Sequence, residues 1–121
     1  MNFKDKIYIA GHAGMVGSAI KRKLQSAGYT NFIDRRSEEL DLRNQQQVDL
    51  FFKEHQPDYV FLAAAKVGGI AVNNSFKADF IYDNLMIQNN VIHSSHIYKV
   101  KKLLFLGSSC IYPKNVPQPI N

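Results

Sequence analysis

The sequence predicts an α/β fold in which alternating strands and helices build a doubly wound parallel sheet. Short apolar runs alternate with stretches of helical periodicity along the 121 residues, an order typical of right-handed βαβ units. The run at residues 59–65 is apolar without interruption, which favours a parallel strand buried on both faces. A glycine-rich turn at residues 11–17 joins the first strand to the first helix, as in sheets that bind dinucleotides.

The first strand is expected at residues 7–10, and the helix that follows is expected to end near Gly28. Between them, Gly11 allows a sharp turn, Gly14 allows a pyrophosphate to approach the backbone, and Gly17 allows the helix to pack closely on the strand. The N–H groups and the dipole at the start of the helix favour an anion. The alternative is a glycine-rich turn that binds no ligand.

The later elements are expected in the same alternation. Residues 31–34 form a second strand. Asn44 with Gln47 resembles a capping box that opens a helix, which ends at Pro57. One face of this helix carries Val48, Phe51, Phe52 and His55.

Beyond the third strand, a loop rich in Gly and Asn is expected at residues 68–75 and a long helix at 78–98. A fourth strand is expected at 103–106 and a proline-rich loop at 113–121. Four strands are fewer than the six or so of a complete dinucleotide-binding sheet. We therefore expect an incomplete Rossmann-type sheet, consisting of its first four strands.

Composition and charge narrow the classes of protein further. The net charge of +5 suits an anionic ligand such as a nucleotide, and the scattered basic residues argue against nucleic acid. Cys110 is the single cysteine, so no internal disulfide forms and a cytoplasmic location is expected. No signal-peptide pattern or apolar run of membrane-spanning length occurs. His93 and His96 lack a third ligand at metal-binding spacing, so no metal is expected.

Three segments together resemble one family. They are residues 9–18 (IAGHAGMVGS), residues 62–70 (LAAAKVGGI) and residues 103–114 (LLFLGSSCIYPK). In this order they closely resemble the GDP-L-fucose synthases, which belong to the extended short-chain dehydrogenases/reductases. The G-x-x-G-x-x-G spacing indicates only the superfamily, whereas the second and third segments are far more specific to this family. The resemblance covers essentially the whole chain.

The resemblance implies an enzyme that epimerises GDP-4-keto-6-deoxy-D-mannose at C3 and C5 and reduces C4 with NADPH. It implies that Ser108 is the catalytic serine and that Cys110 is the acid/base of epimerisation, helped by a histidine from later in the chain. It also implies a cofactor site composed of Gly11, His12, Ala13, Gly14, Met15, Val16, Gly17, Arg35, Arg36, Ser37, Asp41, Leu42, Ala63, Ala64, Ala65, Leu106, Gly107, Ser108 and Ser109.

Physical chemistry supports these two catalytic roles and also leaves alternatives. A hydroxyl at the carboxyl end of a strand, such as that of Ser108, can stabilise a developing oxyanion, although a serine there is also a common turn residue. A lone cysteine such as Cys110 is usually a small buried apolar residue. It shuttles protons when its pKa is lowered or when a partner helps.

The residues at the end of the expected second strand indicate whether the cofactor is NAD or NADP. Asp34 argues for NAD, because an acid at this place binds the ribose 2′-hydroxyl in NAD sites. Arg35 and Arg36 follow directly and argue for NADP, which the family also uses. His12 can approach a 2′-phosphate as well, although some family members have arginine there. On balance we expect NADP(H).

The Tyr-x-x-x-Lys pair of short-chain dehydrogenases, which protonates the product and orients the nicotinamide, has no convincing match in the chain. In the family this pair, the partner histidine and the sugar-binding domain come later. Residues 1–121 are therefore expected to be the N-terminal part of an NADP-binding Rossmann domain without the substrate domain. The alternatives are an NAD-dependent nucleotide-sugar epimerase or dehydratase, against which Cys110 and residues 62–70 argue, and a non-catalytic dinucleotide-binding module.

The long helix at residues 78–98 carries apolar residues on two faces, so one face can cover the sheet and the other can meet a partner helix. The family's dimers use helices of this region. We expect a homodimer when the protein is complete.

Overall fold

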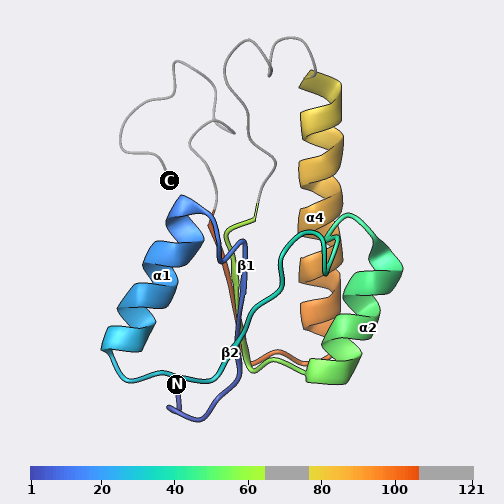
Figure 1. Ribbon diagram of the computed structural model, residues 1–121. Coiled ribbons are helices and arrows are strands. Elements are labelled where there is room, and N and C mark those ends of the chain that lie inside the picture. The colour runs from blue at the N-terminus through green and yellow to red at the C-terminus, as the bar shows by residue number, and fades with distance from the viewer. Residues whose placement is uncertain (65–76, 107–121) are drawn as a thin grey trace, which may run out of the picture.

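The computed structural model, described here for residues 1–64 and 77–106, contains a four-stranded parallel sheet (Figure 1). The strands lie in the order β2-β1-β3-β4. Their bounds are β1 Ile7–Ala10, β2 Phe32–Ile33, β3 Tyr59–Leu62 and β4 Lys102–Phe105. The predicted α/β fold with a parallel sheet is confirmed.

Helices cover both faces of the sheet, as a doubly wound fold requires. Helix α1 (Met15–Ser26) lies on one side, and α2 (Gln45–His55) and α4 (Lys77–Ile97) lie on the other (Figure 1). Each of these helices lies close to a predicted range, and α2 has both a side-chain cap and a periodic apolar face. Two further predicted segments, the loop at 68–75 and the tail at 113–121, lie outside the described residues.

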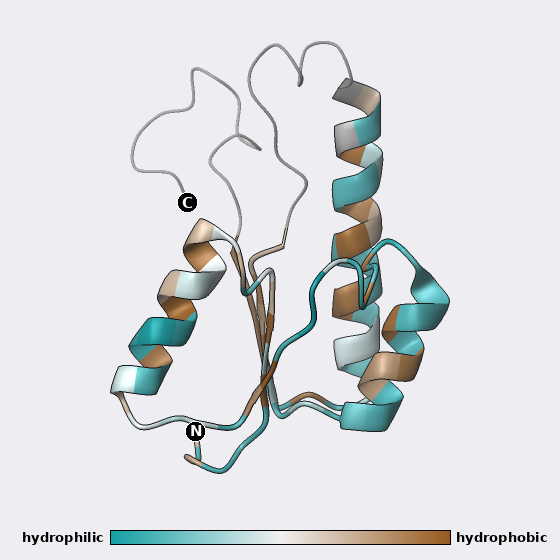
Figure 2. Cartoon of the chain, viewed as in Figure 1, coloured by the Kyte–Doolittle hydropathy of each residue, from teal (hydrophilic) through white to brown (hydrophobic). Residues whose placement is uncertain are grey.

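The main core lies between the sheet and the helices α2 and α4. Tyr8 from the central strand packs against two rings of α2, with ring centroids 4.6 Å from Phe51 and 6.1 Å from Phe52. Figure 2 shows apolar residues along the strands and on the inward sides of these helices. The buried members of this core are Tyr8, Ala10, Leu40, Val48, Phe51, Phe52, Val60, Leu62, Ile87 and Val91. The predicted inner face of α2 is therefore confirmed, with His55 half-buried at its end.

The opposite face of the sheet is less completely covered. Ile7 and Ile9 are fully buried on the side of α1. Phe61, which is in register with Ile9, is only half-buried, and Leu104 on β4 is 43% exposed. The prediction that the third strand is buried on both faces is therefore wrong for Tyr59 and Phe61, because α1 packs mainly on β1 and leaves β3 and β4 less covered.

Two strands are shorter than predicted. β2 comprises Phe32–Ile33, because only Ile7 and Tyr8 pair with it and the Asp34 side chain is bound by Lys21. β3 ends at Leu62, where its pairing with β1 ends. The expected last strand residue, at position 65, lies outside the described residues.

The predicted capping box of α2 is half formed. Asn44 accepts a hydrogen bond from the Gln47 backbone N–H (3.1 Å), so it is the N-cap as predicted. The Gln47 side chain does not return this bond. It accepts instead from the Asp41 N–H (3.0 Å), while Asn44 donates its own N–H to the Asp41 carbonyl (3.0 Å). The helix start is thereby tied to the loop that precedes it.

Candidate functional site

A cavity of about 1010 Å³ opens at the carboxyl ends of β1 and β3. Helix α1, which connects β1 to β2, lies on one face of the sheet, and α2, which connects β2 to β3, lies on the other (Figure 1). The strand order therefore reverses between β1 and β3. In open α/β sheets, ligands bind in the crevice at such a reversal. The cavity is lined by Tyr8, Gly11, His12, Ala13, Gly14, Arg35, Arg36, Ser37, Glu38, Leu40, Asp41, Leu42, Arg43, Ala63, Ala64 and Ile87.

The glycine turn is shaped by close backbone packing. Gly11 has a φ of 88°, and a Cβ there would lie 2.8 Å from the backbone N of Ala64. A Cβ on Gly17 would overlap the carbonyl of Gly11. Larger residues at either position would push the turn away from β3 or the helix away from the turn. The two glycines therefore keep the cavity wall formed by the turn close to the end of β3.

The start of α1 is suited to an anion. Gly14 is the N-cap, its position lacks a side chain that could satisfy the N–H groups of the first turn, and this turn contains no acidic residue. The first N–H groups of a helix have no partner within the helix, and its dipole is positive at this end. Gly14 also lines the cavity. A diphosphate placed in the cavity would meet these donors without a competing carboxylate in that turn.

Most of the described residues that the sequence assigned to the cofactor line this one cavity: Gly11, His12, Ala13, Gly14, Arg35, Arg36, Ser37, Asp41, Leu42, Ala63 and Ala64. Four other described residues of that set do not line it: Met15, Val16, Gly17 and Leu106. Ala65, Gly107, Ser108, Ser109 and Cys110 lie outside the described residues.

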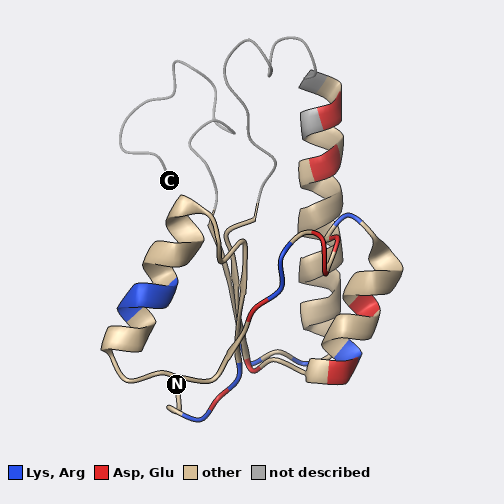
Figure 3. Cartoon of the chain, viewed as in Figure 1, with Lys and Arg blue, Asp and Glu red and all other residues tan. Residues whose placement is uncertain are grey.

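Arg35 and Arg36 form part of the cavity wall, on the loop that leaves β2 (Figure 3). The Arg35 guanidinium donates to the carbonyl of Asp34 (2.7 Å) and lies 3.1 Å from His55 Nε2. It also lies over the ring of Phe51, 5.7 Å from the centroid. The side chain of Arg36 is exposed and has no polar partner among the described residues. Arg36 is therefore the more available of the two for a ligand.

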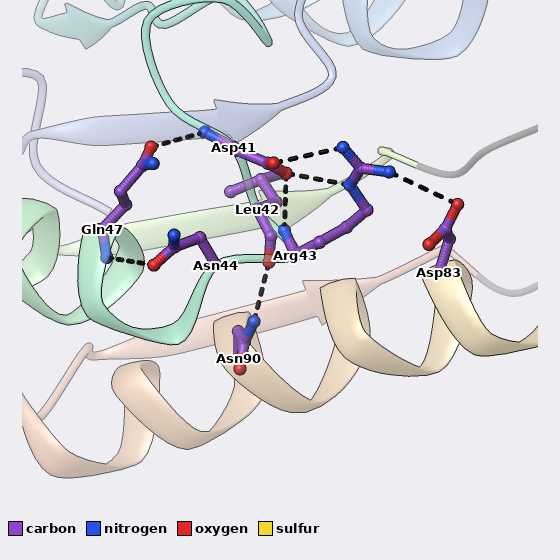
Figure 4. Close-up of polar contacts among 7 residues, drawn as sticks. All are labelled: Asp41, Leu42, Arg43, Asn44, Gln47, Asp83 and Asn90. Atoms are coloured by element: carbon purple, nitrogen blue, oxygen red, sulfur yellow. Dashed lines mark hydrogen bonds and ion pairs between the residues drawn. The ribbon is translucent and has the colours of Figure 1, made fainter.

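The next part of the wall is held by a charged network around Arg43 (Figure 4). Arg43 donates through Nε (3.0 Å) and Nη2 (3.1 Å) to the two carboxylate oxygens of Asp41. Its Nη1 lies 3.5 Å from the carboxylate of Asp83 on α4. The hydrogen bonds from Arg43 lower the pKa of the Asp41 carboxyl below its usual value. Asp41 is therefore a charged acceptor at the cavity wall.

A second contact fixes the same loop to α4. The buried side chain of Asn90 donates through Nδ2 to the carbonyl of Leu42 (2.9 Å) (Figure 4). Because Gln47 binds the N–H of Asp41, the backbone is held on both sides of the Asp41–Leu42 peptide. The loop thus has a defined position against two helices.

Sequence reasoning missed three residues of the cavity wall: Tyr8, Arg43 and Ile87. Glu38 and Leu40 also line the cavity, and they fall within the segment 37–42 that was expected at the adenosine. Arg43 could have been suspected, because it follows Asp41 by two residues and can form an ion pair with it. Nothing in the sequence distinguishes Tyr8 and Ile87 from ordinary core residues. Burial raises the pKa of the Tyr8 hydroxyl, so this phenol stays protonated.

One Tyr-x-x-x-Lys spacing does occur, between Tyr98 and Lys102. These residues are not on one helix, because α4 ends at Ile97 and Lys102 begins β4. The Tyr98 hydroxyl donates to Asp49 (2.8 Å), and this hydrogen bond raises the pKa of Tyr98. Lys102 lies at the amino end of its strand, whereas the cavity lies at the carboxyl ends. This spacing does not form the dehydrogenase pair.

The described part of the chain shows no group of three or more His, Cys, Asp or Glu side chains that could hold a metal ion. Within the same residues, no helix is long and apolar enough to cross a membrane.

Comparison with known proteins decides the family. Residues 7–121 match the NAD dependent epimerase/dehydratase family. The chain belongs to this family. The expected resemblance to GDP-L-fucose synthases is also confirmed. The chain is 64% identical over 115 residues to putative GDP-L-fucose synthase 2 of Arabidopsis thaliana. It is 54% identical over 117 residues to GDP-L-fucose synthase of Escherichia coli.

These matches cover 95% and 97% of the chain, but 35% and 36% of the two relatives, so the chain spans about a third of their length. Among solved structures, a GDP-D-glycero-L-gluco-heptose synthase from Campylobacter jejuni, determined in the presence of NADPH, is similar with a TM-score of 0.94 and 52% identity. That match covers 100% of this chain and 35% of the other. Similarity of this degree is thus shared by proteins named for different GDP-sugars.

Proposed function

We propose that this member of the NAD dependent epimerase/dehydratase family is the cofactor-binding part of a GDP-L-fucose synthase. The reaction converts GDP-4-keto-6-deoxy-D-mannose to GDP-L-fucose by epimerisation at C3 and C5 and reduction at C4. The observation that carries the proposal is the single cavity that unites the glycine turn, the basic pair after β2 and the Asp41–Leu42 loop. The 64% identity to putative GDP-L-fucose synthase 2 of Arabidopsis thaliana, which extends over 95% of this chain, supports the choice of substrate.

NADP(H) fits the residues of the cavity. The glycine turn and the start of α1 would hold the pyrophosphate, because they offer N–H donors next to close backbone packing. Arg36 with Ser37 would bind the 2′-phosphate, and Asp41 with Leu42 would hold the adenine. Residues 63–65 and 106–109 would lie along the nicotinamide half. When bound, NADPH supplies the hydride for C4.

Two residues outside the described part of the structure would act on the sugar. The Ser108 hydroxyl would donate a hydrogen bond to the C4 carbonyl oxygen and stabilise the negative charge that develops there. The 4-keto group acidifies the protons at C3 and C5. Cys110 would move these protons together with a histidine from elsewhere in the full-length protein.

The experiment that tests this function follows proton exchange in the full-length protein. The keto-sugar substrate is incubated in deuterated water, and deuterium at C3 and C5 is measured with and without NADPH. We expect exchange at both carbons and, with NADPH, formation of GDP-L-fucose. In Cys110→Ser, exchange falls by about 10²–10⁴ because a positioned acid/base is lost, while NADPH still binds. Unchanged exchange in this variant would return Cys110 to a structural role.

One observation favours a second function. Asp34 at the end of β2 is the acid expected in an NAD site, and it suits an NAD-dependent nucleotide-sugar epimerase or dehydratase. Its side chain does not line the cavity and is paired with Lys21, which supports NADP instead. Tighter binding of NAD(H) than of NADP(H) by the full-length protein would favour this alternative.

We further propose that the full-length protein is a homodimer that takes a GDP-sugar substrate in the cytoplasm. The outer face of α4 supports association, because it exposes Ile81, Leu85 and Ile92, each between 43% and 52%. Ile87 and Val91 on the inner face are buried in the core. Helix α4 therefore has a second, exposed apolar face in addition to the face that packs in the core.

A further inference from the structure

A lysine of α1 binds the carboxylate of Asp34, the residue that directly follows β2. Lys21 Nζ forms an ion pair with Oδ2 of Asp34 and also lies over the ring of Phe32, 5.4 Å from its centroid. The side chain of Lys21 is 24% exposed. An ion pair with Asp34 and a ring contact with Phe32 therefore hold this ammonium group in one place, unlike that of an ordinary surface lysine.

Lys21 pairs with one oxygen of the Asp34 carboxylate, and the other oxygen is enclosed by the protein. This second oxygen, Oδ1, is buried and has no hydrogen-bond partner among the described residues. The neighbouring Arg35 donates to the Asp34 carbonyl instead of the carboxylate, and its guanidinium is turned toward His55. Within the described part of the chain, Lys21 is thus the one cation paired with this carboxylate.

The position of Asp34 makes this pairing important for the ligand. Asp34 directly precedes Arg35 and Arg36, which line the cavity, whereas Asp34 does not line it. A carboxylate at the end of this strand can accept from a ribose 2′-hydroxyl, and it repels a 2′-phosphate. An adjacent ammonium group opposes that repulsion and keeps the carboxylate directed toward α1.

We propose that Lys21 is a positioning residue that sets the preference for NADPH over NADH by holding and neutralising Asp34. The inference rests on the proposed NADP(H) site and adds a determinant that lies outside the cavity wall. Without Lys21, the Asp34 carboxylate would repel the 2′-phosphate and could turn to the ribose hydroxyl of NADH. Both effects lower the preference for NADPH over NADH.

The test measures dissociation constants for NADPH and NADH by fluorescence titration of the full-length protein. In Lys21→Met, we expect the preference for NADPH to fall by about fivefold or more, because the Asp34 carboxylate then has no ammonium group to offset its repulsion of the phosphate. Lys23→Met is the matched control. It removes the same charge from the same helix, its side chain is exposed and without a polar partner among the described residues, and we expect a change of less than about twofold.

A double-mutant cycle shows whether Lys21 acts through Asp34. Asp34→Asn alone should keep the preference for NADPH, and adding Lys21→Met to it should change the preference by less than about twofold. An equal loss from Lys21→Met in both backgrounds would mean that Lys21 acts on the phosphate directly, and it would overturn the inference. The cycle also remains informative if Lys21→Met alone does not fold, because the two variants that carry Asp34→Asn have no unpaired carboxylate at this position.

The outcomes separate this inference from the proposed function. If the wild-type protein prefers NADPH and folded Lys21→Met keeps the full preference, the role of Lys21 is disproved and the cofactor site stands. If the wild-type protein binds neither cofactor, or binds both equally, the proposed NADP(H) site fails and the inference falls with it.

Discussion

Arg35 and Arg36 are adjacent in the sequence but have different surroundings. Arg35 is engaged by Asp34, His55 and the ring of Phe51, whereas the Arg36 side chain is exposed beside the cavity. We therefore expect Arg36→Ala in the full-length protein to weaken NADPH binding by about 1.5–3 kcal/mol, the value of one charge-assisted contact. The affinity for NADH should change little, so the difference between the affinities for NADPH and NADH becomes smaller.

Titration calorimetry of both cofactors checks this expectation for Arg36. Arg22→Ala is a suitable control, because Arg22 is an exposed arginine of α1 that does not line the cavity. Equal dissociation constants for NADPH and NADH in the wild-type protein would refute the assignment of the basic pair to the 2′-phosphate.

The ion pair between Asp41 and Arg43 predicts a pH dependence of stability. Arg43 lowers the pKa of Asp41 in the folded state, so the pair stabilises the fold above the unfolded value near 3.9. The contribution is lost as pH falls through the lowered folded pKa. Because both side chains are more than a third exposed, we expect solvent screening to keep this stabilisation small.

Urea denaturation of wild type and Arg43→Leu measures this contribution. The free energy of unfolding should differ between them at pH 7, and the difference should shrink as the pH falls below the unfolded value near 3.9 and through the lowered folded pKa of Asp41. A difference that is constant across this range would show that Arg43 acts through packing and not through the Asp41 charge.

At the level of single residues, short-range rules succeed where tertiary contacts do not intervene. The roles of Gly11 and Gly17 follow from their spacing, because backbone packing at a strand–helix junction leaves little choice. The partner of Asp34 could not be predicted, since Lys21 reaches it from another element. For the same reason the sequence did not separate Arg35 from Arg36.

Helix α4 links the core to the wall of the cavity through Asn90. Its buried amide donates to the Leu42 carbonyl (2.9 Å). Asn90→Leu would leave that carbonyl without its partner, so we expect a loss of about 1–3 kcal/mol in the free energy of unfolding. Asn89→Leu, on the exposed side of the same turn, should cost less than about 0.5 kcal/mol. Equal losses in thermal or urea unfolding would contradict the importance of this contact.

The outer face of α4 leads to a prediction about assembly. Leu85 is 51% exposed on this face, and a charge there should oppose burial against a second copy. We expect the full-length protein to be dimeric by light scattering at micromolar concentration and Leu85→Lys to be monomeric. Leu50→Lys on α2, where the leucine is 62% exposed, should leave the mass unchanged. A monomeric wild type would disprove the proposed dimer.

Among the elements, those with strong local signals were predicted best. Helix α2 was predicted from its cap and its periodic apolar face, and both are present. Strands β2 and β3 are shorter than predicted, because a strand ends where its partner ends and not where apolar residues end. The capping box was half right, since the loop backbone at Asp41 competed for the Gln47 side chain.

Across the whole sheet, burial is uneven. All four residues of β1 are buried at the centre, whereas Leu104 and Phe105 on β4 are 43% and 41% exposed. Exposed apolar residues on an edge strand of the described sheet invite pairing or aggregation. We therefore expect the isolated 121-residue chain to have marginal solubility and weak affinity for NADPH.

The same polypeptide should show no turnover. Reduction at C4 needs a proton donor beside the carbonyl, and the tyrosine with dehydrogenase spacing, Tyr98, is bound to Asp49 at the end of α4 remote from the cavity. The raised pKa of Tyr98 further opposes transfer of its proton. An assay that follows NADPH absorbance with the keto-sugar should match the control without enzyme. Reduction above that control by residues 1–121 alone would show that this chain supplies its own proton donor, and the mechanism proposed here would be wrong.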